Sequence, residues 1–190
     1  TRQALLNAAE EVFGEYSYDR ASIAEITRRA GVAQGTFYVY FPDKRSAFVE
    51  LVQDLNHGLR RHIAEAVAGS NSRLEMERVG LRAFFEFAAS HRALYKVVRE
   101  AEFVDEDIYR WHYRTLGAAY ANGLEDAVER GQISDDISPE SLAWMLRGIA
   151  ELLGSRWVIL EPQAPPDDEI DEVMTFVARG VGYCEPKDQP

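Results

Sequence analysis

The sequence has little cysteine and no long uncharged apolar run. Its 190 residues include one cysteine, Cys184, so a disulfide within the chain is excluded, and we expect this residue on a late helix. No run approaches the eighteen or so apolar residues that a membrane span needs. A signal-peptide pattern is also missing. The expected compartment is therefore the cytoplasm, and we expect no membrane partner.

Motifs of common enzyme classes are missing as well. The sequence shows no glycine-rich phosphate loop, no HExxH, no Cys-x-x-Cys and no Gly-x-Ser-x-Gly. The histidines His57, His62, His91 and His112 lack the spacing of metal ligands, so we interpret them as packing or surface residues. We therefore expect no enzymatic activity, no metal and no cofactor.

Cations are scarce overall, but they are unevenly distributed. The chain holds 21 Lys and Arg against 32 Asp and Glu, a net charge of −11, which by itself argues against a nucleic-acid partner. Residues 1–66, however, hold eight cations against nine anions, and the cations cluster at Arg28, Arg29, Lys44 and Arg45. A local basic face can bind DNA although the rest of the molecule repels it.

The alternation of period two that is typical of strands is also largely missing. Apolar residues recur at three- and four-residue steps, which predicts an all-α fold. We expect the first helix to end near Gly14. The predicted helices are residues 4–13, 23–29, 33–40, 43–68, 73–89, 91–102, 105–130, 138–161 and 167–184.

The second and third predicted helices form a helix-turn-helix. Ser22 and Glu25 have the spacing of a capping box, in which each side chain satisfies a free backbone N–H. Gly31 permits a tight turn, and Pro42 ends the short helix that follows. In such a unit the second helix enters the DNA major groove. Asp43 is a cap for the fourth helix.

The segment GVAQGTFYVYFPDKRSAF combines apolar anchors with outward polar groups. Gln34 suits adenine and Thr36 suits thymine, whereas the Tyr38 and Tyr40 hydroxyls suit phosphate oxygens. Gly35 permits close backbone approach. The predicted DNA-binding residues are Ser22, Arg28, Gln34, Gly35, Thr36, Tyr38, Tyr40 and Lys44.

The run ASIAEITRRAGVAQGTFYVYFPDKRSAF resembles the DNA-binding signature of the tetracycline-repressor (TetR) family of bacterial regulators. The likeness covers about 45 residues, from ALLNAAEEVF to SAFVELV, and departs at Ser22, where the family more often has Thr. The family's phosphate-contacting residues fall on Tyr38, Tyr40 and Lys44. The resemblance implies a three-helix DNA-binding domain over residues 1–45 and a helical effector-binding and dimerisation domain over 46–190.

That resemblance also implies function. It implies a transcriptional repressor that binds a palindromic operator as a homodimer and that a small-molecule effector releases. A helical binding protein without a DNA function is the distant alternative.

The last two predicted helices are too apolar to face water on all sides. They either close the core of one chain or, as the resemblance implies, form a four-helix interface between two chains. The predicted interface residues are Leu146, Ile149, Leu153, Trp157, Val173, Val177 and Val181.

The helix predicted at 105–130 carries aromatic residues on two sides, so it either packs a thick core or lines a ligand cavity. The segments REAEFV and GLEDAVERGQI, with the spaced tyrosines, also resemble the acyl-CoA-responsive repressors of fatty-acid and phenylacetate degradation. The alternative effector is a neutral lipophilic drug or metabolite controlling an efflux or detoxification gene. The predicted ligand-binding residues are Phe84, Phe87, Tyr95, Phe103, Tyr109, Arg110, Tyr113, Arg114 and Tyr120.

Overall fold

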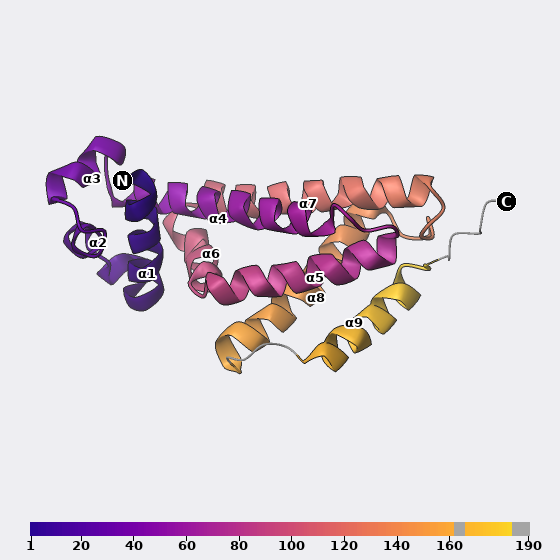
Figure 1. Cartoon of the computed structure of the whole chain (residues 1–190). Helices are drawn as coiled ribbons and strands as arrows, with labels where there is room; N and C mark the ends of the chain where they lie inside the picture. Colours follow the sequence, from indigo (N-terminus) through magenta and orange to yellow (C-terminus); the bar gives the residue numbers. More distant parts are fainter. Residues whose placement is uncertain (162–165, 184–190) are drawn as a thin grey trace. The chain divides into compact units, whose positions relative to one another are not determined.

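The computed structural model describes residues 1–161 and 166–183, which form helices joined by short connections (Figure 1). These ranges contain no strand, so the predicted all-α fold is confirmed. No helix within them is long and apolar enough to span a bilayer. The elements are α1 (Arg2–Arg20), α2 (Ile23–Arg29), α3 (Gln34–Tyr40), α4 (Lys44–Val67), α5 (Arg73–Ser90), α6 (Leu94–Val104), α7 (Glu106–Glu129), α8 (Pro139–Ser155), η1 (Arg156–Leu160) and α9 (Asp167–Gly180).

The chain divides into two compact units. Unit 1 comprises residues 1–58 and 91–113, and unit 2 comprises residues 59–90 and the described residues from 114 onward. This division does not coincide with the expected boundary between residues 45 and 46. The physical reason is that α4 begins at Lys44 and continues without a break, so residue 45 lies inside a helix rather than in a linker.

The core of unit 1 is built on the apolar face of α1. Leu5, Val12 and Phe13 are fully buried there, and Phe48 of α4 packs edge-on against Phe13 with ring centroids 5.2 Å apart. Burial of a phenylalanine side chain contributes about 1.5–3 kcal/mol, so this cluster anchors α1 to α4.

The first helix was expected to end near Gly14; α1 instead extends to Arg20, although its regular helical backbone is interrupted at Ser17. Gly14 serves close packing instead: a Cβ atom placed on it would lie 2.7 Å from the Cβ of Ala93, just before α6. The helix bends three residues later, at Ser17, where φ is 67° and ψ is 161°.

The core of unit 2 draws on four helices. Phe85 of α5, Leu124 of α7, Leu142 of α8 and Met174 of α9 belong to one buried apolar cluster. Since α8 and α9 both contribute to it, each of these helices has one face committed to the interior of its own chain.

The last helix ends earlier than predicted, and the helix before it changes its form near its end. The helix expected over 138–161 is α8 followed by the π-helical turn η1, and the helix expected to reach residue 184 ends at Gly180. Gly182 has a positive φ of 59°, a conformation that terminates helices, and the N–H of Tyr183 turns back to the carbonyl of Ala178. Cys184 lies outside the described residues.

Candidate nucleic-acid interface

Residues 22–40 form the predicted helix-turn-helix, and Figure 1 shows α1, α2 and α3 packed together. The Ser22 hydroxyl accepts a hydrogen bond from the N–H of Glu25 at 3.1 Å, which caps α2 as expected. Gly31 has a φ of 68°, and the N–H of Val32 returns to the carbonyl of Thr27 at 3.0 Å. Glycine therefore makes the sharp turn that carries the chain from α2 into α3.

Buried side chains orient α3. Phe37 is fully buried and Phe41, the residue that ends α3, is 1% exposed, with ring centroids 5.3 Å apart. Ile26 of α2 is also fully buried, so α3 is held from the interior side.

The opposite side of α3 faces solvent. Gln34 and Gly35 are exposed, Thr36 is half-buried, and Tyr38 and Tyr40 are 52% and 39% exposed. An amide, a hydroxyl and two phenols on one short helix can meet base edges and phosphates. We call Gln34, Thr36, Tyr38, Val39 and Tyr40 the reading face.

Val39 is the residue of this face that sequence reasoning missed. It is 76% exposed, the most exposed large apolar residue of α3. Helical spacing was a signal, because Val39 follows the buried Phe37 by two residues, about 200° around a helix, and therefore faces the opposite side. An exposed valine can contact the methyl group of thymine.

The arginines of α2 are held by carboxylates. Arg28 donates to both carboxylate oxygens of Glu25, at 2.8 and 2.6 Å, yet the Arg28 side chain is 69% exposed. The guanidinium of Arg28, and then that of Arg29, lowers the pKa of Glu25 to about 2. Because exposed ion pairs contribute little stability, the Arg28 pair can be exchanged for a phosphate contact.

Arg29 joins two helices rather than facing solvent. It pairs with Glu25 on its own helix at 2.8 Å and with Glu15 of α1, and Glu11 lies 3.6 Å away. The hydrogen bonds that Arg29 donates to Glu25 and then to Glu15 raise the pKa of its guanidinium. This cluster fixes α2 against α1.

The Lys44 ammonium does not lie where a phosphate ligand is expected, because it contacts backbone carbonyls at the end of α1. Its ammonium donates to the backbone carbonyls of Tyr18 at 2.7 Å and Ala21 at 3.0 Å, and it lies 4.4 Å from the centre of the Tyr18 ring. A third, longer contact reaches the carbonyl of Asp19 at 3.4 Å. The three donors of this ammonium are thus directed at the end of α1.

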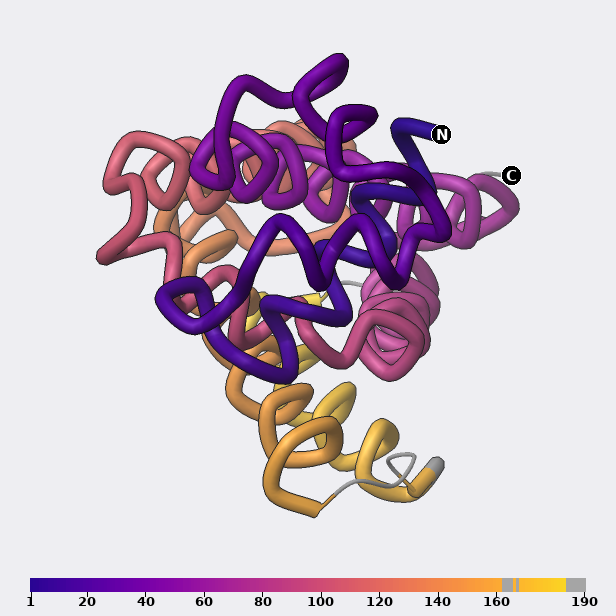
Figure 2. The backbone as a smooth tube through the Cα atoms, turned by 90° about the vertical axis from the view of Figure 1, so that its left-hand side faces the viewer, coloured from indigo at the N-terminus to yellow at the C-terminus, as the bar shows by residue number. Residues whose placement is uncertain are grey.

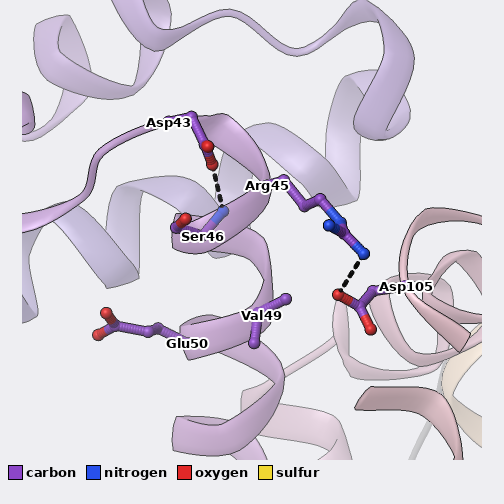
Figure 3. A pocket seen from close by; sticks show the side chains of 6 residues that line it. All are labelled: Asp43, Arg45, Ser46, Val49, Glu50 and Asp105. Carbon is purple, nitrogen blue, oxygen red and sulfur yellow. Dashed lines mark hydrogen bonds and ion pairs between the residues drawn. The ribbon is translucent and has the colours of Figure 1, made fainter. Parts of the chain in front are cut away.

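Arg45 is the neighbouring cation, and its side chain is 61% exposed. It pairs with Asp105 at 2.9 Å, on one side of a shallow pocket of about 280 Å³ (Figure 3). Asp43 caps α4 through the N–H of Ser46 at 2.7 Å, as predicted. With Asp43, Glu50 and Asp105 in its lining, this pocket is too acidic to hold a phosphate.

The predicted ligand-binding residues are divided between the units. In unit 1, Tyr95 is buried, Tyr109 and Tyr113 are half-buried with rings 4.9 Å apart, and Arg110 pairs with Glu106. Phe103 is 87% exposed, so it lines no cavity within unit 1.

In unit 2 the predicted ligand residues are Phe84, Phe87, Arg114 and Tyr120. Phe84 is half-buried, Phe87 is buried, and Arg114 is exposed. The Tyr120 hydroxyl donates to Glu77, which also pairs with the buried Arg73. Burial, and then Glu77, raises the pKa of Tyr120 well above its usual value. Tyr120 therefore belongs to a polar network that ties α5 to α7.

The predicted dimer residues lie in the interior of unit 2. Leu146, Val177 and Val181 belong to its buried cluster, Trp157 is 5% exposed, and Ile149, Leu153 and Val173 pack against the cluster. The sequence pattern identified the apolar stripe of each helix. In the structure this stripe packs against the core of the same chain. Other residues are exposed on the same elements: Trp144, Met145, Leu152, Ile159, Leu160 and Phe176.

Among the described residues, no three His, Cys, Asp or Glu side chains gather as metal ligands would. Together, an all-α fold, a capped helix-turn-helix and an exposed polar reading face define a DNA-binding protein. Residues 5–51 match the family model described as "Bacterial regulatory proteins, tetR family". The chain belongs to this family and is a TetR-family DNA-binding transcriptional regulator.

Similar proteins extend the likeness along nearly the whole chain. The HTH-type transcriptional regulator YvdT of Bacillus subtilis is 24% identical over 95% of this chain and 94% of its own length. The HTH-type transcriptional activator FasR of Mycolicibacterium smegmatis is 22% identical over 96% and 83%. No catalytic family is indicated among these matches.

The fold is shared with a solved regulator. The crystal structure of FadR from Bacillus subtilis in complex with stearoyl-CoA superposes with a TM-score of 0.82, at 19% identity. The match covers 95% of this chain and all of that one. The likeness establishes the fold alone.

Proposed function

We propose that the chain is a dimeric repressor that binds a near-palindromic operator and is released by an apolar or acyl-thioester effector. The reading face carries the first part of this proposal. Gln34, Tyr38 and Tyr40 project from a helix whose Phe37 is fully buried, so the polar groups are presented in a defined direction. A reading helix of this kind enters the major groove.

Dimerisation is assigned to the outer surfaces of α8 and α9. Figure 2 shows the end of α8 (orange) next to α9 (yellow). Met145, Leu152 and Phe176 are 55%, 72% and 65% exposed, and Gly148 and Gly180 are exposed on the same helices. Glycine permits close helix approach, and burial of a leucine or phenylalanine contributes about 1.5–3 kcal/mol. A second copy is the occupant that a two-fold operator requires, with reading helices about 34 Å apart.

The effector is assigned by chemical class. A shared fold with a regulator solved with stearoyl-CoA supports an acyl-thioester, and the Tyr109–Tyr113 ring pair supports an apolar ligand of either class. Coenzyme A phosphates also need cations. Lys96 is bound to a backbone carbonyl, so arginines such as Arg114, which is exposed, are the candidates for that role.

The direction of regulation is part of the proposal. Release requires that the effector bind more tightly to the state that cannot engage both half-sites, since equal affinity would shift nothing. A typical coupling of about 1–3 kcal/mol corresponds to a 5–150-fold loss of DNA affinity. The relative FasR is named an activator. If the effector tightened DNA binding instead of weakening it, release would be wrong and activation would be favoured for this chain.

DNA reading is tested with a duplex that the wild-type protein selects from a random-sequence pool. We expect Gln34→Ala to relax selectivity at one base position by about 1–3 kcal/mol. Tyr38→Phe should weaken binding to all duplexes alike, because a phosphate contact carries no sequence information. Equal effects of both variants on every duplex would contradict the reading role of Gln34.

The effector class is tested by titrating acyl-CoAs of several chain lengths, free coenzyme A and neutral lipophiles against the protein–DNA complex. Binding of an acyl-CoA should weaken with added salt because its phosphates are charged, whereas binding of a neutral lipophile should not. If neither series changes DNA affinity, the proposed effector is wrong, while the DNA-reading results stand. The proposal includes no cofactor and no catalytic step, and it places the protein in the cytoplasm.

A further inference from the structure

The bend in α1 depends on one unusual residue. Among the described residues, Ser17 is the only non-glycine with a positive φ. Residues other than glycine rarely occupy this backbone region, and they remain there only when the surrounding structure holds them.

The bend separates two backbone groups that would pair in a continuous helix. In an α-helix the N–H of Tyr18 would donate to the carbonyl of Gly14, four residues earlier. Here the Tyr18 N–H donates to the carboxylate of Glu100 at 2.9 Å, and the Gly14 carbonyl accepts from the ammonium of Lys96 at 2.6 Å. Both halves of one helical hydrogen bond are thus satisfied by charged groups.

Lys96 and Glu100 lie one turn apart on α6, so they approach α1 from the same side. Two further contacts join α1 to the residues just before α6. His91 lies 3.0 Å from the Glu10 carboxylate, and Gly14 lets Ala93 approach closely. The pairing of α1 with α6 is therefore specific in register rather than a general apolar contact.

The bent end of α1 leads directly into the helix-turn-helix. Lys44 holds the carbonyls of Tyr18 and Ala21, and Ala21 precedes Ser22, the cap of α2. A change in the direction of residues 18–21 would therefore change where α2 begins, and with it the place of the reading face.

We propose that Lys96 and Glu100 are positioning residues for DNA binding. They hold the bend of α1 by replacing both partners of one helical hydrogen bond that the bend removes, that between the Tyr18 N–H and the Gly14 carbonyl, and the bend sets the position of α2 and α3. Neither residue contacts DNA in this role, and the role does not depend on which effector the protein binds.

The test combines a local and a functional measurement on the full chain. Amide hydrogen exchange at Tyr18, followed by NMR, reports the Glu100 contact directly. We expect Glu100→Met to accelerate that exchange about tenfold, the effect of losing one hydrogen bond to a charged group. Affinity for the selected duplex should fall by about the same factor, because strain at Ser17 is then free to relax.

Matched variants separate positioning from charge. Glu102→Met removes an exposed anion from the same helix, so it changes net charge equally and should alter neither the Tyr18 exchange nor the selectivity. Lys96→Met should lower affinity for the selected duplex relative to a non-cognate one, and Lys96→Arg should restore it. Circular dichroism verifies that each variant remains helical.

Three results would overturn the proposal. Faster Tyr18 exchange in Glu100→Met with unchanged selectivity would limit the contact to local structure. Unchanged Tyr18 exchange would mean that the contact does not protect the bend. If the wild-type protein selected no duplex, DNA reading would fail and this role with it, although the exchange result would still establish whether the contact forms.

Discussion

Two surfaces of this chain expose large side chains, and they differ in chemistry. On α3, Tyr38 and Tyr40 carry hydroxyls, and the exposed Arg28 lies on the preceding helix of the same motif. On α8 and α9, the exposed Met145, Leu152 and Phe176 have no polar group, and the exposed Gly148 and Gly180 lie on the same helices. The surface on α2 and α3 suits DNA, which is a polar and charged polymer. The surface on α8 and α9 suits another apolar surface, such as its counterpart on a second copy of the chain.

The largest expected effect separates the outer surface of α8 from its inner stripe. Leu152 is 72% exposed, whereas its neighbour Leu153 packs against the core of unit 2. We expect Leu152→Glu to place a charge in the proposed dimer interface, at a cost of several kcal/mol, and to yield a helical monomer by sedimentation.

Leu153→Glu is the matched variant, because it introduces the same charge one residue along the helix. It should lower the midpoint of urea unfolding, since the carboxylate would enter the core of one chain. If Leu152→Glu remained dimeric while Leu153→Glu was folded but monomeric, the outer surface would not be the dimer interface. The interface would then lie on the apolar stripe, as the sequence predicted.

The next effect concerns Lys44 and Arg45, adjacent cations at the start of α4. Because the Lys44 ammonium is directed at backbone carbonyls, we expect Lys44→Met to weaken binding to every duplex without changing its salt dependence. Arg45→Met should instead reduce the slope of log K against log salt by about one, as expected for an exposed cation that reaches a phosphate.

Filter binding at several salt concentrations measures both slopes. A slope reduced by about one in Lys44→Met would mean that Lys44 leaves the α1 carbonyls and contacts a phosphate, as its resemblance to the family's lysine implies.

The smallest effect concerns the charges behind the reading face. The pKa of Glu25 is lowered from an ordinary value of 4.5 to about 2, so its contribution to stability is full above pH 4.5. That contribution is lost as the pH falls toward 2, because the unfolded chain binds the proton first. We expect Arg28→Met and Arg29→Met each to raise the pKa of Glu25, as measured by NMR titration of its carboxyl carbon.

Arg20→Met is the control, since it removes an exposed cation of α1 that bonds the carbonyl of Tyr16 rather than Glu25. A Glu25 titration that is unchanged in both α2 variants would show that neither guanidinium stabilises the carboxylate.

The helix-turn-helix could be predicted from the sequence because its signals are local. A hydroxyl cap at Ser22, a glycine at the turn and a proline after α3 each act within a few residues of the backbone that they direct. The residues that face outward on α3 followed from helical spacing, and the same spacing places Val39, which was missed, on the side opposite the buried Phe37.

Tertiary structure decided the rest, because helical periodicity identifies an apolar stripe but not the partner that covers it. The apolar stripes of α8 and α9 pack against the core of their own chain. The dimer interface is therefore proposed on the outer surface of these helices, at Leu152 and Phe176. Lys44 resembled a phosphate ligand in the sequence, but it binds carbonyls of α1 more than 20 residues away along the chain, and Lys96 binds another carbonyl of α1 more than 80 residues away. Contacts over such separations depend on the packing of whole helices, and no local pattern encodes them.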